Sequence, residues 1–345
     1  MPLLEEQGWR FSFWVPRPGA LYDELADRGW DVDGAPRSIE YGVRAWRLPP
    51  GARRRLARTP SYVRRYRAFL DSRRPALVHA NSILTLAEGL IAKRMGYPVL
   101  LHVHEMLPRN ARSWVFLRAA WRNLDQIVGV SEPCAARLAW RGRSPRIVYE
   151  AAPVPAEPVE LRSCPDPFKV GTVAVVSTRK GSDLFVEAAR LLGERGSRCQ
   201  FEMVGVPHEI ELDWGQEVLE RARAAGITHI PQANVFERFT QWDAFALPSR
   251  ADPFPIAMLE AMASGLPVIG ARRDGIADQV VPGTGVLIEP ENPRALADAI
   301  AWMAGQHSRT RKRMAAAARA RVSANFTISQ QAAAIDEVYR DTLGP

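Results

Sequence analysis

Short apolar strand patterns alternate with helical patterns in two successive rounds along the chain. The first round contains four such runs, at residues 11–15, 77–80, 99–103 and 126–130. The second begins at Phe168 and contains runs at residues 170–176, 201–206 and 243–248. Alternation of this kind is typical of parallel sheets wound with helices and disfavours all-β and all-α folds. We therefore predict an α/β chain of two doubly wound parallel-sheet domains.

The length of the chain agrees with two domains. Its 345 residues exceed one typical core and suit two units of about 150 residues each. Residues 149–167 are rich in proline and show almost no periodicity, which is typical of a linker. We predict an N-terminal domain over residues 1–150, a linker over 151–167 and a second domain over 168–327.

The cysteines and the apolar runs indicate the compartment. Cys134, Cys164 and Cys199 form no C-x-x-C pair and have no histidines at ligand spacing, which argues against a disulfide framework and structural zinc. No stretch approaches the roughly 18 apolar residues of a membrane span, and the first residues lack a signal pattern. We expect a cytoplasmic chain, either soluble or peripheral on the inner membrane face.

Positive charge is concentrated in the first half, where residues 1–150 hold 25 Lys+Arg against 14 Asp+Glu. Within it, Arg53 to Arg74 carries nine arginines and the single acid Asp71, with Tyr62, Tyr66, Phe69 and Leu70 near helical spacing. Two interpretations stay open: a basic face that binds anionic lipid headgroups or lipid-linked phosphates, or a solvated helix in an arginine-rich chain. Nucleic acid is not expected, because no recognition module or stacking platform is present.

A pair of acids stands out in the second half, within SRADPFPIAMLEAMASGLPVIG at residues 249–270. Asp252 and Glu260 are separated by seven residues, and a short apolar helix over 256–263 is closed by Gly265. Residues 266–269 then read as a buried strand. Asp252 therefore lies in a loop and Glu260 on the helix, so two acids in different environments can serve one ligand. The alternative is an ordinary helix with two unrelated surface acids.

A second constellation lies at the start of the same domain. A strand pattern at residues 170–176 leads into Arg179, Lys180 and Gly181, and a helix follows with Ser182 as its expected N-cap. Cations beside a helix N-terminus favour an anion such as a diphosphate, because the unpaired amides and the macrodipole add to their charge. A merely soluble turn is the competing interpretation.

Polar residues also follow the strands of the first domain, where ligands of wound sheets gather. They are Asn81 after the second strand pattern, His104 and Glu105 after the third, and Ser131 after the fourth. The imidazole of His104 could bind a sugar hydroxyl or steady developing charge, although a satisfied histidine at a strand end is the plainer interpretation. No third ligand accompanies His102 and His104, so we predict no metal site.

The acid-pair segment resembles the donor-binding signature of the family 4 glycosyltransferases of the GT-B fold, which carries two acids seven residues apart. This resemblance implies two Rossmann-like domains facing a cleft. It implies that Glu260 holds the ribose hydroxyls and Asp252 touches the transferred sugar, although the family usually has glutamate at the first position. The residues between them, Phe254, Pro255 and Ile256, belong to the implied donor site.

Other positions extend the resemblance, which covers residues 75–345 well. Lys180-Gly181 stands as the family expects and implies a grip on the donor diphosphate, but Ala174-Val175 replaces the usual Gly-Arg, so Arg179 is the candidate second cation. Gly205 matches a family landmark. Asp274-Gly275 begins a loop that in the family reads Gly-Gly-x-x-Glu and contacts the sugar. The comparable histidine of the family lines the cleft, which implies that role for His104.

The ends of the chain also bear on the comparison. Family members open with a strand, a glycine-rich acceptor loop and a helix before the segment that residues 3–16 resemble. We therefore expect the N-terminal domain to lack its first, inner strand, and favour a true start upstream of Met1 over a remodelled domain or a damaged homologue. The resemblance also implies that the helix over residues 328–345 packs back on the first domain.

The activity implied by the resemblance is retaining transfer of a sugar from a UDP- or GDP-linked donor to a hydroxyl acceptor, either lipid-linked or a cell-surface glycan precursor. Asp252, His104 and Lys180 take the catalytic roles, without metal or any cofactor besides the nucleotide sugar as co-substrate. The main alternative is a noncatalytic partner subunit that binds a nucleotide sugar. A GT-B phosphorylase or an epimerase stays open, whereas a dinucleotide oxidoreductase is disfavoured because no G-x-G-x-x-G follows a strand.

Overall fold

A computed structural model of the chain describes residues 2–16, 19–35 and 52–344, without the side chains of residues 52–58. These residues form two compact units. The first comprises the described residues within Met1–Gly129, Ala135–Val148 and Ala332–Pro345, and the second comprises Val130–Cys134 and Tyr149–Gln331. Both units are built from parallel strands and helices, so the predicted α/β class with two Rossmann-like domains is confirmed.

The strands of the first unit fall into two separate parallel sheets. One contains β3 (Val78–Asn81), β4 (Val99–Val103), β5 (Gln126–Gly129) and β6 (Arg146–Ile147) in that order. The other pairs β1 (Ser12–Val15) with β2 (Asp31–Gly34). Among the described strands no hydrogen-bonded ladder joins the two sheets. The expectation that this domain lacks an inner strand stays a prediction.

Helices cover these sheets, and their amphipathic faces explain why they form. α3 (Ala52–Arg73) buries Tyr62, Tyr66, Phe69 and Leu70, as the spacing predicted. The other helices assigned wholly or partly to this unit are α1 (Pro2–Glu6), α2 (Ala20–Asp27), the 3-10 turn η1 (Ile83–Thr85), α4 (Leu86–Arg94), α5 (Ala111–Asn123), α6 (Glu132–Leu138) and α14 (Ile328–Leu343). Val338 and Tyr339 of α14 pack in one cluster with Leu100 and Val128 of the sheet.

The second unit is a single six-stranded parallel sheet in the order β12-β11-β10-β7-β8-β9. Its strands are β7 (Phe168–Val173), β8 (Cys199–Val204), β9 (Thr228–Ile230), β10 (Ala244–Leu247), β11 (Val268–Ala271) and β12 (Val286–Ile288). Every residue of β10 and β11 is buried. Their short, uninterrupted apolar runs fit strands covered on both faces.

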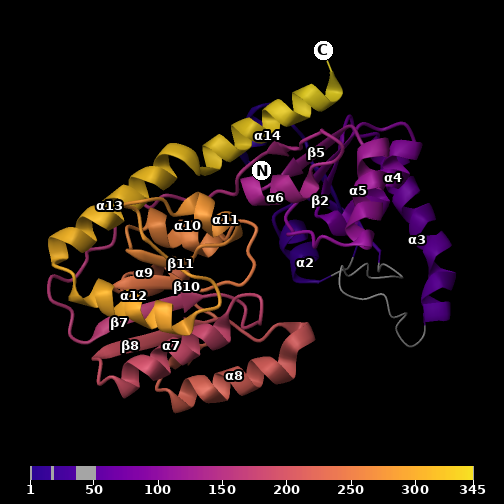
Figure 1. Ribbon diagram of the computed structural model, residues 1–345. Helices are drawn as coiled ribbons and strands as arrows, with labels where there is room; N and C mark the ends of the chain where they lie inside the picture. The colour runs from indigo at the N-terminus through magenta and orange to yellow at the C-terminus, as the bar shows by residue number, and fades with distance from the viewer. Residues whose placement is uncertain (1, 17–18, 36–51, 345) are drawn as a thin grey trace. The chain divides into compact units, whose positions relative to one another are not determined.

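Helices cover both faces of this sheet (Figure 1). On one face lie α7 (Ser182–Glu194), α8 (Leu212–Ala224) and α12 (Pro293–Gly305), and on the other lie α10 (Ile256–Ala263), α11 (Asp274–Gln279) and α13 (Ser308–Asn325). The 3-10 turn η2 (Glu209–Glu211) precedes α8, and α9 (Val235–Phe239) precedes β10. None of the helices that the structure describes combines the length and the hydrophobicity needed to cross a bilayer.

Two local expectations need correction. The N-cap of α7 is Gly181 and not Ser182. Gly181 has a φ of 68° and lies so close to β10 that a Cβ would be 2.2 Å from the Pro248 carbonyl oxygen, so only glycine fits there. Ser182 is the first helical residue, and its Oγ accepts the Ser177 N–H at 3.2 Å. The strand expected from Leu266 begins at Val268, because the Leu266 N–H closes α10 on the Ala261 carbonyl at 3.0 Å.

Candidate functional site

The loop between β7 and α7 is held at the carboxyl end of the sheet. Its Val176 N–H donates to the Val206 carbonyl at 2.8 Å, which fixes the loop beside the end of β8. Glu211 of η2 accepts both the N–H and the hydroxyl of Thr178, at 2.7 and 2.9 Å. The loop then turns through Arg179, Lys180 and Gly181 into the N-terminus of α7. Two cations therefore lie at a helix start, an arrangement that suits an anion.

Asp252 meets these cations from the neighbouring loop. Because β7 pairs with β10, the loops that follow the two strands lie side by side. The Asp252 carboxylate accepts Lys180 Nζ at 2.6 Å and Ser249 Oγ at 3.2 Å, and Arg179 Nη1 lies 3.7 Å from it. Asp252 is only 4% exposed. The structure thus brings together three of the residues predicted to handle the donor.

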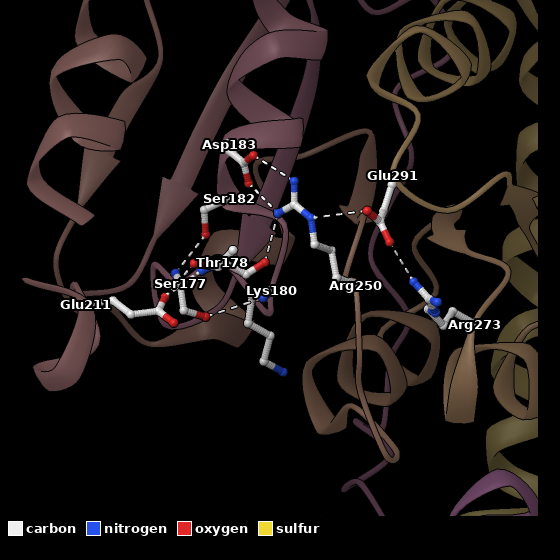
Figure 2. Close-up of polar contacts among 9 residues, drawn as sticks. All are labelled: Ser177, Thr178, Lys180, Ser182, Asp183, Glu211, Arg250, Arg273 and Glu291. Carbon is white, nitrogen blue, oxygen red and sulfur yellow. Dashed lines mark hydrogen bonds and ion pairs between the residues drawn. The ribbon is translucent and has the colours of Figure 1, made fainter. Parts of the chain in front are cut away.

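Arg250, two residues earlier, connects the two loops. Its guanidinium pairs with Asp183 of α7 through two hydrogen bonds of 2.7 and 2.8 Å and also donates to the Thr178 carbonyl at 2.9 Å. Figure 2 shows it between the carboxylates of Asp183 and Glu291, and Glu291 in turn pairs with Arg273 at 2.9 Å. The bond to Asp183 raises the pKa of Arg250 above its usual value.

The loop after β11 closes on the same place. Asp274 Oδ2 accepts the Asp252 N–H at 3.2 Å, and the Gly275 N–H donates to the Asp252 carbonyl at 3.0 Å. A Cβ on Gly275 would lie 1.9 Å from the Pro253 carbonyl oxygen. Asp274 and Gly275, where the sequence differs from the family loop, thus contact Asp252 directly.

Glu260 occupies the helix of the acid pair. It lies on α10 and is half-buried, and burial raises the pKa of its carboxyl group. Among the described side chains and amides, none donates a hydrogen bond to its carboxylate. A carboxylate of this kind suits a ligand that brings its own donors, such as the hydroxyls of a ribose.

The remaining predicted positions of the second unit have the following places in the fold. Phe254 is buried between Tyr149 and Phe326, with ring centroids 5.1 and 5.3 Å away, so its ring belongs to an aromatic cluster. Pro255 is the N-cap of α10 and Ile256, its first residue, is 45% exposed. Gly205 approaches the Ala174 carbonyl so closely that a Cβ would lie 1.9 Å from it, and the buried Ser131 accepts the Cys134 N–H at 3.2 Å.

In the first unit, the structure brings Asn81, His104 and Glu105 together at the carboxyl ends of β3 and β4. His104 Nε2 lies 2.6 Å from Asn81 Oδ1. Glu105 accepts the His104 N–H and the Ile83 N–H at 3.1 Å, together with a short hydrogen bond from Ser82 Oγ. Glu105 therefore fixes the turn after β3, and the imidazole of His104 is oriented by an amide.

Two further imidazoles extend from His104 into the core. The His102 ring lies between those of His79 and His104, with ring centroids 5.4 and 4.3 Å away; it is stacked on the first and tilted against the second. His79 Nδ1 lies 2.7 Å from the Tyr339 hydroxyl. Burial, with a smaller contribution from His104, lowers the pKa of His79 to about 4. Burial also lowers the pKa of His102 well below its usual value. Both rings are therefore neutral at physiological pH.

Sequence reasoning missed the charges around Arg250. Asp183, Glu211, Arg273 and Glu291 lie on four different segments, so spacing along the chain could not group them. Arg250 itself carried a usable signal, because it follows the carboxyl end of a buried parallel strand. No group of three or more metal-ligating side chains occurs among the described residues.

Comparison with known proteins assigns this arrangement to a class. Residues 3–153 match the family described as Glycosyl transferase 4-like domain, and residues 155–321 match the family described as Glycosyl transferases group 1. The two Rossmann-like units and the acid-pair segment thus define a GT-B glycosyltransferase fold. More narrowly, the chain belongs to the group 1 glycosyltransferases, with a 4-like first domain.

Sequence relatives match over part of their length. The chain is 32% identical to the lipopolysaccharide core biosynthesis mannosyltransferase LpsB of Rhizobium meliloti over 195 residues, which are 52% of this chain and 53% of LpsB. It is 34% identical to the D-inositol 3-phosphate glycosyltransferase of Corynebacterium diphtheriae over 134 residues, 36% of this chain and 31% of that protein. The chain therefore spans about half the length, or less, of these relatives.

Solved structures share the fold over nearly the whole chain. HepE of Anabaena, crystallised with UDP and glucose, matches with a TM-score of 0.78 at 19% identity, covering 94% of this chain and 90% of HepE. Sucrose-phosphate synthase of Thermosynechococcus elongatus matches with a TM-score of 0.72 at 20% identity, covering 96% and 95%. At these identities the likeness establishes the fold.

Proposed function

We propose that this chain is a retaining glycosyltransferase that moves a sugar from a nucleoside diphosphate sugar to a hydroxyl acceptor. One observation carries the proposal: Lys180 and Arg179 converge on Asp252 at the N-terminus of α7. Charge develops on the leaving diphosphate as the glycosidic bond breaks, and fixed cations with helix-end amides stabilise it. Positioning and electrostatics therefore supply the catalysis, and neither acid is proposed as a covalent nucleophile.

The donor is proposed to be UDP- or GDP-linked. UDP-glucose is the first to test, because the HepE structures hold UDP and UDP-glucose; the GDP-linked sugars follow. Glu260 would hold the ribose through hydrogen bonds to its carboxylate, with Asp252 and His104 toward the sugar. The Asp274-Gly275 loop, which touches Asp252, would influence which sugar is accepted.

The acceptor and the setting are also proposals. A lipid-linked or cell-surface glycan precursor is favoured by the basic helix α3, whose Arg64 and Arg67 are exposed. Such a face attracts anionic headgroups or the phosphates of a lipid-linked acceptor. We place the protein in the cytoplasm, peripheral on the inner membrane face, and propose that transfer needs no metal. Chelation should then leave the rate unchanged, and dependence on added magnesium or manganese would contradict this.

The test combines binding with turnover. A thermal-shift screen against UDP, GDP and their sugars should single out the donor, because a bound ligand raises the melting temperature according to its concentration relative to Kd. The radiolabelled donor is then offered to a hydroxyl acceptor mixture, and the anomeric configuration of the product is read by NMR. Lys180→Met should abolish transfer. Failure of every nucleotide to stabilise the protein would remove the proposal.

A noncatalytic partner subunit is the second candidate. It is favoured by the two separate sheets of the first unit and by the uncharged Val175 in the loop after β7. Such a subunit would bind the nucleotide sugar without turnover. Co-purification of a homologous subunit that restores transfer would support it, and turnover by the purified chain alone would exclude it.

A further inference from the structure

We propose that Asp252 is an internal counter-ion of the donor site, and that its carboxylate competes with the donor diphosphate for Lys180 and Arg179. The proposal rests on the function proposed above. Asp252 would then act on Lys180 and Arg179 before it contacts any sugar. Neutralising Asp252 should therefore strengthen nucleoside diphosphate binding but slow sugar transfer.

The contacts of the carboxylate support this role. Oδ2 of Asp252 lies 2.6 Å from Lys180 Nζ, and Oδ1 lies 3.7 Å from Arg179 Nη1, so each oxygen faces a cation. The two partners of the shorter pair are 5% and 16% exposed as side chains. Ser249 Oγ donates a further bond of 3.2 Å and fixes the carboxylate on this side. Lys180 and Asp252 are therefore largely shielded from solvent and attract each other strongly, whereas the Arg179 side chain is 43% exposed and its attraction to Asp252 is weaker.

The loops offer a diphosphate little else that is positive. In the described residues of 174–183 and 249–252, the cationic side chains are Arg179, Lys180 and Arg250. Arg250 is committed to Asp183 by two hydrogen bonds, and Figure 2 shows its guanidinium directed to Asp183 and Glu291 while the Lys180 side chain extends away from them. Within these two loops, the cations left to a diphosphate at the start of α7 are therefore Lys180 and Arg179, which Asp252 already contacts.

Charge then fixes the direction of the effect. A diphosphate brings at least two negative charges to a site that already contains one, and that carboxylate must give up its contacts with Lys180. Neutralising Asp252 removes both the repulsion and the competition, so nucleoside diphosphate binding should strengthen by about tenfold. Transfer should fall in the same variant, because the displaced carboxylate is the group available to accept a sugar hydroxyl.

The experiment measures UDP and GDP binding to the full chain by calorimetry. Asp252→Asn should bind the preferred diphosphate about tenfold more tightly than the unaltered chain and transfer sugar more slowly. Asp252→Glu keeps the charge and should bind within about twofold of the unaltered chain. Asp213→Asn changes net charge equally at an exposed position of α8 and controls for long-range effects.

Two further variants test the ion pair of Lys180 with Asp252. Ser249→Ala keeps every charge and loosens the carboxylate, so it should strengthen diphosphate binding by about two- to threefold even if Asp252→Asn folds poorly. In a Lys180→Met background, the gain from Asp252→Asn should disappear, because coupled residues are not additive.

The outcomes separate the two proposals. Suppose that the unaltered chain binds the diphosphate, but Asp252→Asn or Ser249→Ala binds it equally well or more weakly. That result overturns the counter-ion role and leaves the proposed donor site intact. No binding of UDP or GDP to any variant overturns the donor site itself and the counter-ion role with it.

Discussion

Arg250 and Asp183 form a bidentate ion pair, with Nη1–Oδ1 and Nη2–Oδ2 distances of 2.7 and 2.8 Å, that joins the loop after β10 to the start of α7. Both side chains are 23% exposed, so the pair is partly shielded from solvent. A bidentate guanidinium–carboxylate pair fixes the relative orientation of the two side chains and also contributes binding energy. The pair therefore holds the backbone that carries Arg179 and Lys180 against the backbone that carries Asp252.

Replacing Arg250 by lysine should test this role. Lysine keeps the charge but cannot form the two parallel bonds, so the two loops should separate slightly and donor binding should weaken by about tenfold. The melting temperature should fall by only a few degrees, because the cost is about 1–2 kcal/mol. Steady-state kinetics separate weaker donor binding from slower turnover. KM for the donor should rise, and kcat should fall by a smaller factor. Unchanged KM would show that the pair does not position the site.

Glu260 should give donor binding a dependence on pH. Burial raises the pKa of this carboxyl group, so it becomes protonated at a higher pH than an ordinary glutamate with a pKa of 4.5. Protonation removes the negative acceptor that ribose hydroxyls need, so donor affinity should decline as the pH is lowered toward that raised pKa. Glu260→Gln should bind donor about ten- to a hundredfold more weakly at neutral pH and should lose this acidic decline. Calorimetry between pH 5 and 8 measures both, and an unchanged affinity in Glu260→Gln would remove its assignment.

Much of this site could be predicted from the sequence because its residues are local to two strand ends. Asp252, Glu260 and Lys180 belong to short segments whose helices and strands follow from periodicity, and parallel pairing of β7 with β10 brings them together. The ion-pair partner of each charged side chain could not be predicted from the sequence. The pairing of Lys180 with Asp252 joins residues 72 positions apart. The ion pairs from Asp183 through Arg250 to Glu291 likewise join the start of α7 to two loops that are distant in the sequence.

The same limit applies to Phe254, which the resemblance places in the implied donor site. Its ring is buried against Tyr149 and Phe326, so the side chain packs in an aromatic cluster. Those two residues lie at opposite ends of the second unit's sequence, so only the fold could reveal the cluster.

Gly275 should tolerate no side chain. A Cβ there would lie 1.9 Å from the Pro253 carbonyl oxygen, and both backbones are fixed, so Gly275→Ala should lower the free energy of unfolding by about 3 kcal/mol or more. Donor binding should fall with it, because the same loop contacts Asp252. Gly193→Ala is the matched control: Gly193 lies in α7 with no atom within 4 Å of the added Cβ, and alanine should stabilise the helix by about 0.5–1 kcal/mol. Chemical denaturation measures the free energy of unfolding of both variants. Equal values would contradict the close approach of Gly275 to the Pro253 carbonyl oxygen.

The buried imidazoles should make the first unit unstable in mild acid. In the folded protein the pKa of His79 is about 4, compared with 6.5 for an ordinary histidine, and that of His102 is also lowered. Between these values the unfolded chain binds protons that the folded chain excludes, so the free energy of unfolding is complete above about pH 6.5 and falls as the pH drops toward 4, by about 1.4 kcal/mol per pH unit for each group.

His102→Leu removes one of the titrating groups while keeping an apolar side chain in the core. Urea denaturation at pH 7 and pH 5 should show a smaller difference between the two pH values for this variant than for the unaltered chain. His208→Leu, which changes a histidine at the N-cap of η2 in the second unit, should leave that difference unchanged. His79 and His102 owe their neutrality to burial. An equal pH dependence in His102→Leu and the unaltered chain would therefore mean that His102 is charged in the folded protein or that other groups cause the loss of stability in acid.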